Sequence, residues 1–238
     1  ASLTATGDYI PARRAGDELL ASAAMHGSTQ WEARGHHVLG VLDHFVGDVA
    51  AARGHFEAYL ANARSMGSPF HVARGLISPG QLARAEGELE EARAANEEAA
   101  AVFTEQANTF GASVCMDNLG AIALELGDVE RSTAAFRSAL EGYRSLGIQV
   151  GYVTALVGFA AVAARRGEGE RGAMLLGASN AVSASLGTNL DGTDREFRDR
   201  CEAELRASLG DEAFAVAEAA GRAMGVDAAI RLALDGAS

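Results

Sequence analysis

The strongest constraint on the fold is a glycine followed by an acidic residue that recurs every 40 residues. The pair occurs at Gly7-Asp8, Gly47-Asp48, Gly87-Glu88, Gly127-Asp128 and Gly167-Glu168. A glycine can end one helix in a left-handed conformation, and an acidic residue suits the positive end of the next helix. A fixed period of this length indicates stacked helical repeats, because one helix pair cannot bury its apolar face alone.

A second glycine series lies midway between these pairs, at Gly27, Gly67, Gly147 and Gly187. Its missing member is expected one helical turn later, at Gly111. We therefore predict that the second helix before Gly111 is one turn longer than its counterparts and that the array bends irregularly there.

Small and large residues keep the same period. The small positions are Gly40, Gly80, Gly120 and Ala160, and the large apolar positions are Phe56, Phe136 and Leu176. A small residue in mid-helix lets a partner helix approach closely, and a large apolar residue on that partner fills the space between neighbouring pairs. The pattern therefore predicts helix–turn–helix units.

These residues resemble the tetratricopeptide (TPR) motif. The matching residues are Leu39-Gly40 and Leu119-Gly120 in the first helices, and Ala52 with Phe56 and Ser132 with Phe136 in the second. The resemblance implies an all-α, TPR-like α-solenoid, a right-handed superhelix of antiparallel helix pairs. The period of 40 residues in this chain is longer than the usual TPR period of about 34 residues. We expect repeats over residues 1–187, beginning in mid-unit and continuing upstream in the parent protein.

The periodic pattern stops after Gly187. Residues 193–208, 211–223 and 226–235 have the pattern of three shorter amphipathic helices. We expect them to form a C-terminal helical cap over residues 188–238, because repeat arrays need a terminal element that covers the last apolar face.

Three stretches near the C-terminus, Arg171–Ala178, Leu209–Phe214 and Gly221–Met224, resemble the end of large bacterial ATP-binding (STAND-type) regulators of the LuxR-type and AfsR-like group. The resemblance implies a TPR sensor and interaction module of a larger cytoplasmic transcriptional regulator. DNA-binding and nucleotide-binding parts would lie outside this sequence. The alternative is a self-association scaffold of a kinase- or cyclase-linked signalling protein.

The charged residues exclude several functions. All 20 positive residues are arginines, so the chain has no lysine for a P-loop or a Schiff base. A net charge of −12 argues against direct nucleic-acid binding and against an anionic membrane surface. No apolar run reaches the length of a membrane span. Cys115 and Cys201 match no metal or redox spacing, which predicts free thiols in a reducing cytoplasm.

No catalytic or cofactor-binding set is recognisable, so we expect a binding module and not an enzyme, with no cofactor. Gly167–Gly172 matches a dinucleotide-binding pattern, but an alanine-rich helix precedes it, which favours a simple turn. His37, His44 and His55 could together form a metal site, but surface or groove histidines without metal are favoured. The acidic runs Glu86–Glu91 and Asn96–Glu98 are expected to form a solvated outer face.

First helices line the concave surface of a TPR solenoid, and this gives a candidate groove for a protein, a peptide or an anionic ligand. Its expected lining residues are Arg34, His37, Val41, His44, Phe45, Arg74, Ile77, Gln81, Arg84, Asp117, Leu124, Glu125 and Arg165. The N-terminal half of this surface is basic although the chain is acidic. Because arginine binds carboxylates and phosphates in a bidentate manner, we expect an acidic partner there.

Pro79 is the local exception to the repeat. It falls in the middle of an expected helix, where a proline removes a backbone hydrogen bond. We therefore predict a kink or an interruption of that helix near residues 76–80.

Overall fold

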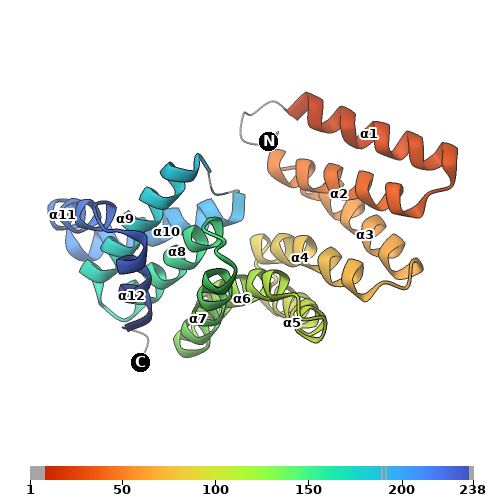
Figure 1. Ribbon diagram of the computed structural model, residues 1–238. Coiled ribbons are helices and arrows are strands. Elements are labelled where there is room, and N and C mark those ends of the chain that lie inside the picture. Colours follow the sequence, from red (N-terminus) through yellow and green to blue (C-terminus); the bar gives the residue numbers. More distant parts are fainter. Residues whose placement is uncertain (1–8, 189, 191, 236–238) are drawn as a thin grey trace. The chain divides into compact units, whose positions relative to one another are not determined.

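The computed structural model describes residues 9–188, 190 and 192–235, and every regular element in these ranges is an α-helix. The helices are α1 (Tyr9–His26), α2 (Thr29–Val46), α3 (Val49–Ser65), α4 (Pro69–Ala85), α5 (Leu89–Glu105), α6 (Thr109–Glu125), α7 (Val129–Leu146), α8 (Val150–Arg165), α9 (Gly169–Leu186), α10 (Gly192–Leu209), α11 (Asp211–Arg222) and α12 (Val226–Asp235). The predicted all-α helical-repeat fold is confirmed (Figure 1).

The chain forms two compact units. The first ends at Ala107 and contains α1–α5, and the second starts at Asn108 and contains α6–α12. The sequence predicts a different boundary, between the repeats and the cap, at residues 187/188. That boundary is defined by the repeat pattern, and it stays a prediction.

Turn glycines separate the helices as the repeat predicts. The left-handed glycines of α1–α9 are Gly27, Gly47, Gly67, Gly87, Gly127, Gly147, Gly167 and Gly187, with φ between +61° and +85°. At two of these turns the following aspartate caps the next helix. The carboxylate of Asp48 accepts from the N–H of Ala51 at 3.1 Å, and that of Asp128 from the N–H of Arg131 at 3.0 Å. These contacts satisfy donors that a helix start leaves unpaired.

The prediction that the turn glycine is shifted to Gly111 is wrong. Ala107 takes the left-handed conformation at the expected turn, with φ of +53°, and α5 has the ordinary length of 17 residues. Gly111 is a buried residue in the first turn of α6, and its N–H donates to the side chain of Asn108 at 3.0 Å. The turn is therefore kept without a glycine, and α5 is not lengthened.

The small mid-helix residues give the close approach that the repeat predicts. A Cβ on Gly40 would lie 2.6 Å from the ring of Phe56, and one on Gly120 would lie 2.8 Å from the ring of Phe136. Neither position has room for a methyl group, so glycine lets each aromatic ring seat against the partner helix. In the α4–α5 pair the same contact is made by Gly80 with the amide of Asn96, not with an aromatic ring.

The predicted interruption at Pro79 does not occur. Helix α4 runs without a break from Pro69 to Ala85, with Pro79 inside it. A proline in this position leaves the carbonyl four residues earlier, that of Gly75, without its usual donor. The helix stays continuous at this position, where Leu76, Gly80 and Leu82 are buried.

The tail helices α10–α12 match the predicted segments to within about one residue at each end. They pack on α8 and α9. The tightest crossing joins α9 to α11, where a Cβ on Gly177 would lie 2.1 Å from the carbonyl oxygen of Glu218. On the other side, a Cβ on Gly221 would lie 1.9 Å from the carbonyl oxygen of Met174. Two of the stretches that carry the family resemblance thus form one helix crossing.

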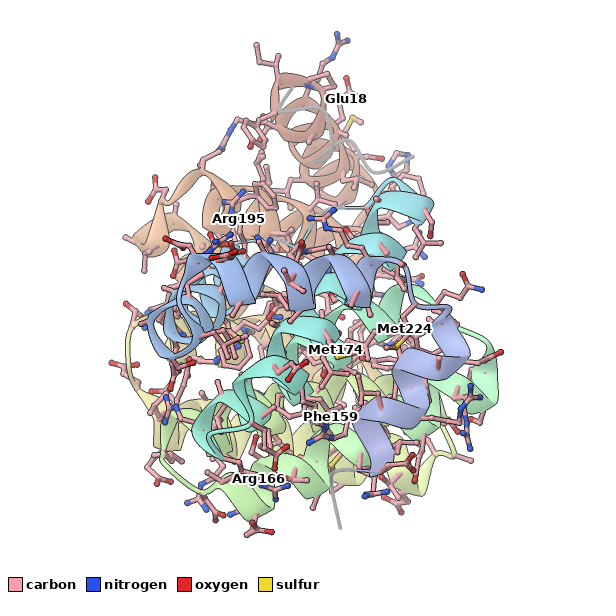
Figure 2. All side chains as sticks on the ribbon, turned by 90° about the vertical axis from the view of Figure 1, so that its left-hand side faces the viewer. Glu18, Phe159, Arg166, Met174, Arg195 and Met224 are labelled. Carbon is pink, nitrogen blue, oxygen red and sulfur yellow. The ribbon has the colours of Figure 1, made fainter. Side chains whose placement is uncertain are left out.

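The core of the second unit is continuous from α6 to α12. Phe136, Phe159, Leu176, Leu205 and Phe214 are among its buried members. Met174 and Met224, labelled in Figure 2, pack against this core from its edge. Arginine side chains tie down the last helix, since Arg171 donates to the carbonyls of Leu232 and Ala233 at 2.9 and 3.1 Å, and Arg137 to that of Leu234 at 3.0 Å.

Candidate functional site

The predicted groove residues divide between the two units. Nine of them lie on α2 and α4 of the first unit, and Asp117, Leu124, Glu125 and Arg165 lie on α6 and α8 of the second. Each set is described within its own unit.

In the first unit, we give the name basic patch to three of the predicted residues: Arg34 and His37, one turn apart on α2, and Arg74 on α4, whose charge acts on His37. Arg34 and Arg74 are exposed, and neither makes an ion pair with a residue that the structure describes. His37 lies one turn along α2 from Arg34 and packs against the ring of Tyr59 in a tilted arrangement, with ring centroids 5.5 Å apart. Burial, with the charge of Arg74 as the second cause, lowers the pKa of His37 to about 4.

The environment of His37 shows how the basic patch is built. The charge of Arg74 on α4 helps to lower the pKa of His37 on α2, and it acts against the burial that raises the pKa of Tyr59 on α3. His37 is neutral at pH 7 and accepts or donates hydrogen bonds without adding charge. The patch therefore offers two solvent-facing guanidinium groups beside one neutral imidazole.

The other first-unit residues give the patch an apolar border or lie away from it. Val41, Ile77 and Gln81 are half-buried on the same two helices. Phe45 packs against Tyr9 of α1, with ring centroids 5.9 Å apart. Arg84 is only 5% exposed, so it does not belong to an accessible surface.

In the second unit, the predicted residues are engaged within the unit. Leu124 lies in the hydrophobic core, and Asp117 is also buried. The carboxylate of Glu125 binds Arg200 of α10 at 2.5 Å, and Arg165 lies 3.3 Å from Glu204 of the same helix. The structure therefore corrects the predicted groove: Arg84, Asp117 and Leu124 are removed by burial, and the charges of Glu125 and Arg165 are already paired.

A polar network in the first unit escaped the sequence analysis. Asp43, 1% exposed, binds Arg13 of α1, and its other carboxylate oxygen lies 3.5 Å from Nε2 of His55 on α3. Nδ1 of His55 lies 2.9 Å from Nδ1 of His36 on α2. The only available signal was the seven-residue spacing of His36 and Asp43, which places both on one helix face.

The histidines do not assemble as a metal site in the described part of the chain. His55 faces His36 and Asp43, whereas His37 faces Tyr59. Among the described residues, no group of three or more His, Cys, Asp or Glu side chains is placed to hold a metal ion.

Both cysteines are buried free thiols, as predicted. Burial raises the pKa of Cys115 and of Cys201 to about 12. They are therefore protonated at pH 7 and poor nucleophiles.

The Gly167–Gly172 stretch is the turn that the sequence predicts. Helix α8 precedes it, Gly167 is left-handed, and α9 begins at Gly169. The acidic runs are mostly exposed, but Asn96 is an exception. It is fully buried, and its amide donates to the carbonyl of Ala92 at 2.8 Å.

On the face of α4 opposite the basic patch, the first unit has a pocket of about 300 Å³ between α3, α4 and α5. The repeat pattern gave no sign of it, because the pocket is formed by three helices from two different pairs. Within the described residues, no helix is both long and apolar enough to cross a membrane.

Comparison with known proteins supports the fold. No family model matches the chain, and no curated protein matches it. Among solved structures, the chain is similar to BtubC (BKLC) from P. vanneervenii, with a TM-score of 0.63 and 19% sequence identity, over 98% of this chain and 92% of that one. At this identity the likeness extends to the helical fold alone.

Proposed function

We propose that this chain is a binding module and that the basic patch of its first unit binds an acidic peptide segment or another anionic group of a partner. The observation that carries the proposal is the state of Arg34 and Arg74, which are exposed and have no ion pair among the described residues. At least eleven of the 20 arginines make ion pairs among the described residues, whereas the guanidinium groups of Arg34 and Arg74 remain available to a partner.

The surroundings suit binding of an extended or helical segment. Each guanidinium can donate two parallel hydrogen bonds to one carboxylate. Val41 and Ile77 are half-buried nearby and offer apolar contact. The net charge of −12 disfavours an acidic partner elsewhere on the chain, so it directs such a partner to this patch.

The resemblance of the C-terminal stretches to ATP-binding regulators supports a wider role. In this role the chain is the sensing and interaction module of a larger transcriptional regulator. Binding at the patch would then shift contacts between the module and the rest of the parent protein.

The test is a titration of fluorescein-labelled hexaglutamate at low salt, followed by fluorescence anisotropy. The Arg34→Glu/Arg74→Glu variant should bind roughly tenfold more weakly than the unaltered chain, since exposed ion pairs contribute about 0.2–1 kcal/mol each and reversal adds repulsion. The control is Arg64→Glu/Arg195→Glu, which changes the net charge equally at two exposed arginines that also lack an ion pair among the described residues. Equal weakening by both variants would show that net charge, and not the patch, governs binding.

A further inference from the structure

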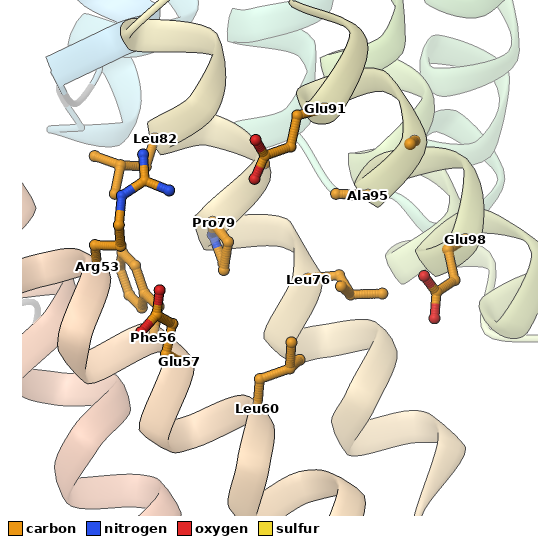
Figure 3. A pocket seen from close by; sticks show the side chains of 12 residues that line it. Arg53, Phe56, Glu57, Leu60, Leu76, Pro79, Leu82, Glu91, Ala95 and Glu98 are labelled. Carbon is orange, nitrogen blue, oxygen red and sulfur yellow. The ribbon is translucent and has the colours of Figure 1, made fainter. Parts of the chain in front are cut away.

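The pocket of the first unit has an apolar interior. Its interior is formed by Phe56 and Leu60 of α3, Leu76, Pro79 and Leu82 of α4, and Ala94 and Ala95 of α5. Figure 3 shows Leu76 and Pro79 of α4 between the α3 wall, which carries Arg53 and Leu60, and the α5 wall, which carries Glu91 and Ala95.

Small side chains explain why the pocket stays open. Helix α5 presents Ala94 and Ala95 to it, and α4 presents Gly80. The corresponding place in the repeat, which holds Phe56 on α3 and Phe136 on α7, holds Asn96 on α5, and the amide of Asn96 turns back to its own helix. A volume of about 300 Å³ is at the lower end of the range of small-ligand pockets.

The rim of the pocket is negatively charged. Glu57, Glu91 and Glu98 line it and are exposed. The one lining cation, Arg53, forms an ion pair with Glu86 and lies 3.6 Å from Glu88. The charge of Arg53 is thus balanced by Glu86 and Glu88, and the three carboxylates that line the pocket leave its mouth favourable to a positive charge.

We propose that this pocket binds a small organic cation: an ammonium group attached to a compact apolar body. The apolar body would displace water from Leu60, Leu76 and Pro79, where its transfer from water is favourable. The ammonium group would stay at the rim beside Glu91 or Glu98, where it keeps part of its hydration. A carboxylate in the same place would face like charges, and a neutral alcohol would gain only the apolar contact.

This site is independent of the basic patch, since it lies on the opposite face of α4 and selects the opposite charge. The two proposals therefore fail separately. The Arg34→Glu/Arg74→Glu variant should bind the organic cation as the unaltered chain does.

The experiment uses three linear probes of six carbons each: hexylammonium, hexanol and hexanoate. Each is titrated near pH 7 into the chain with methyl-labelled leucine, and the resonances of Leu60 and Leu76 report occupancy. Hexylammonium should bind roughly fivefold more tightly than hexanol, because two exposed carboxylates each contribute modestly, and hexanoate should bind most weakly. Binding of hexanoate as tight as that of hexylammonium would overturn the proposal.

Three variants test whether the probes bind in the pocket and whether its carboxylates select the cation. Glu91→Gln/Glu98→Gln should remove the preference of hexylammonium over hexanol, whereas Glu90→Gln/Glu105→Gln, on the same helix but outside the pocket, should keep it. Ala95→Phe should fill the pocket and abolish both. Unchanged hexylammonium affinity in either pocket variant would contradict the assignment. If Ala95→Phe does not fold, the exposed Glu91→Gln/Glu98→Gln pair still decides the question.

Discussion

Nδ1 of His36 lies 2.9 Å from Nδ1 of His55 and joins α2 to α3. One of these nitrogens must donate its hydrogen and the other must accept, so only one of the two rings can be positively charged while the contact is kept. His55 is the ring beside the Asp43 carboxylate, at 3.5 Å. Burial, with the charge of His55 as the second cause, lowers the pKa of His36. The hydrogen bond between α2 and α3 therefore requires at least one neutral ring, and burial favours the neutral form of His36.

Acid should destabilise the first unit through the histidines of α2. The pKa of His37 is lowered from 6.5 to about 4, so between these values the unfolded chain binds more protons than the folded chain. The stabilisation is present above pH 6.5 and is lost as the pH falls toward 4. From about pH 7.5 to about pH 5, the free energy of unfolding should fall by about 2 kcal/mol through His37 alone.

Urea unfolding at these two pH values measures the loss. The His37→Gln variant cannot be protonated at this position. Its free energy of unfolding should therefore fall by about 2 kcal/mol less between the two pH values. An equal pH dependence in the variant and the unaltered chain would show that His37 does not contribute.

Two glycines on neighbouring helices should respond oppositely to replacement by alanine. A Cβ on Gly40 would lie 2.6 Å from the ring of Phe56, whereas a Cβ on Gly54 meets nothing within 4 Å. Gly40→Ala should therefore destabilise the chain by about 1–3 kcal/mol through overpacking. Gly54→Ala should stabilise it by up to about 1 kcal/mol through helix propensity. Thermal unfolding compares them, and a stabilising Gly40→Ala would contradict the close approach of α2 and α3.

Replacement of Ala107 by glycine, the residue that the repeat predicts at this turn, should stabilise the chain. With φ of +53°, it pays the steric cost of the left-handed conformation, which glycine avoids. Ala107→Gly should raise the free energy of unfolding by roughly 0.5–1 kcal/mol in urea titrations. Ala101→Gly, at an exposed site within α5, should lower it by a similar amount. Destabilisation by both changes would exclude a left-handed residue at position 107.

Pro79 should destabilise the folded chain, whereas Pro69 should not. Pro79 lies inside α4, whereas Pro69 begins the helix, where its missing N–H has no helical partner to lose. Pro79→Ala should restore the bond to the Gly75 carbonyl and raise the free energy of unfolding by about 1–3 kcal/mol. Pro69→Ala should change it little. Calorimetry that finds no gain from Pro79→Ala would show that packing offsets the lost bond completely.

The turns and helix caps could be predicted from the sequence, because each depends on residues that are neighbours along the chain. A glycine and a following aspartate specify a turn and a cap, so the helix ends at Gly47 and Gly127 were predicted correctly. The same rule failed at Ala107, because it treats glycine as the only residue able to take a left-handed turn. Alanine is tolerated there, with its N–H donating to the carbonyl of Thr104 at 3.0 Å.

Contacts between distant residues were not readable. Nothing local to Glu125 indicates that Arg200, 75 residues later, binds it. Helical periodicity placed Leu124 on a face but did not distinguish a groove from a core. The pocket depends on side chains from α3, α4 and α5 together, and its acidic rim was seen only as a solvated face.

The most direct test of the proposed binding surface is a map of where an acidic partner lies. Hexaglutamate titrated into isotopically labelled protein should shift the backbone and guanidinium resonances around Arg34–Val41 on α2 and Arg74–Gln81 on α4. The resonances of α3, α5 and the second unit should remain largely unchanged. Shifts concentrated outside α2 and α4, or no saturable shifts at low salt, would contradict the assignment of the basic patch as the binding surface.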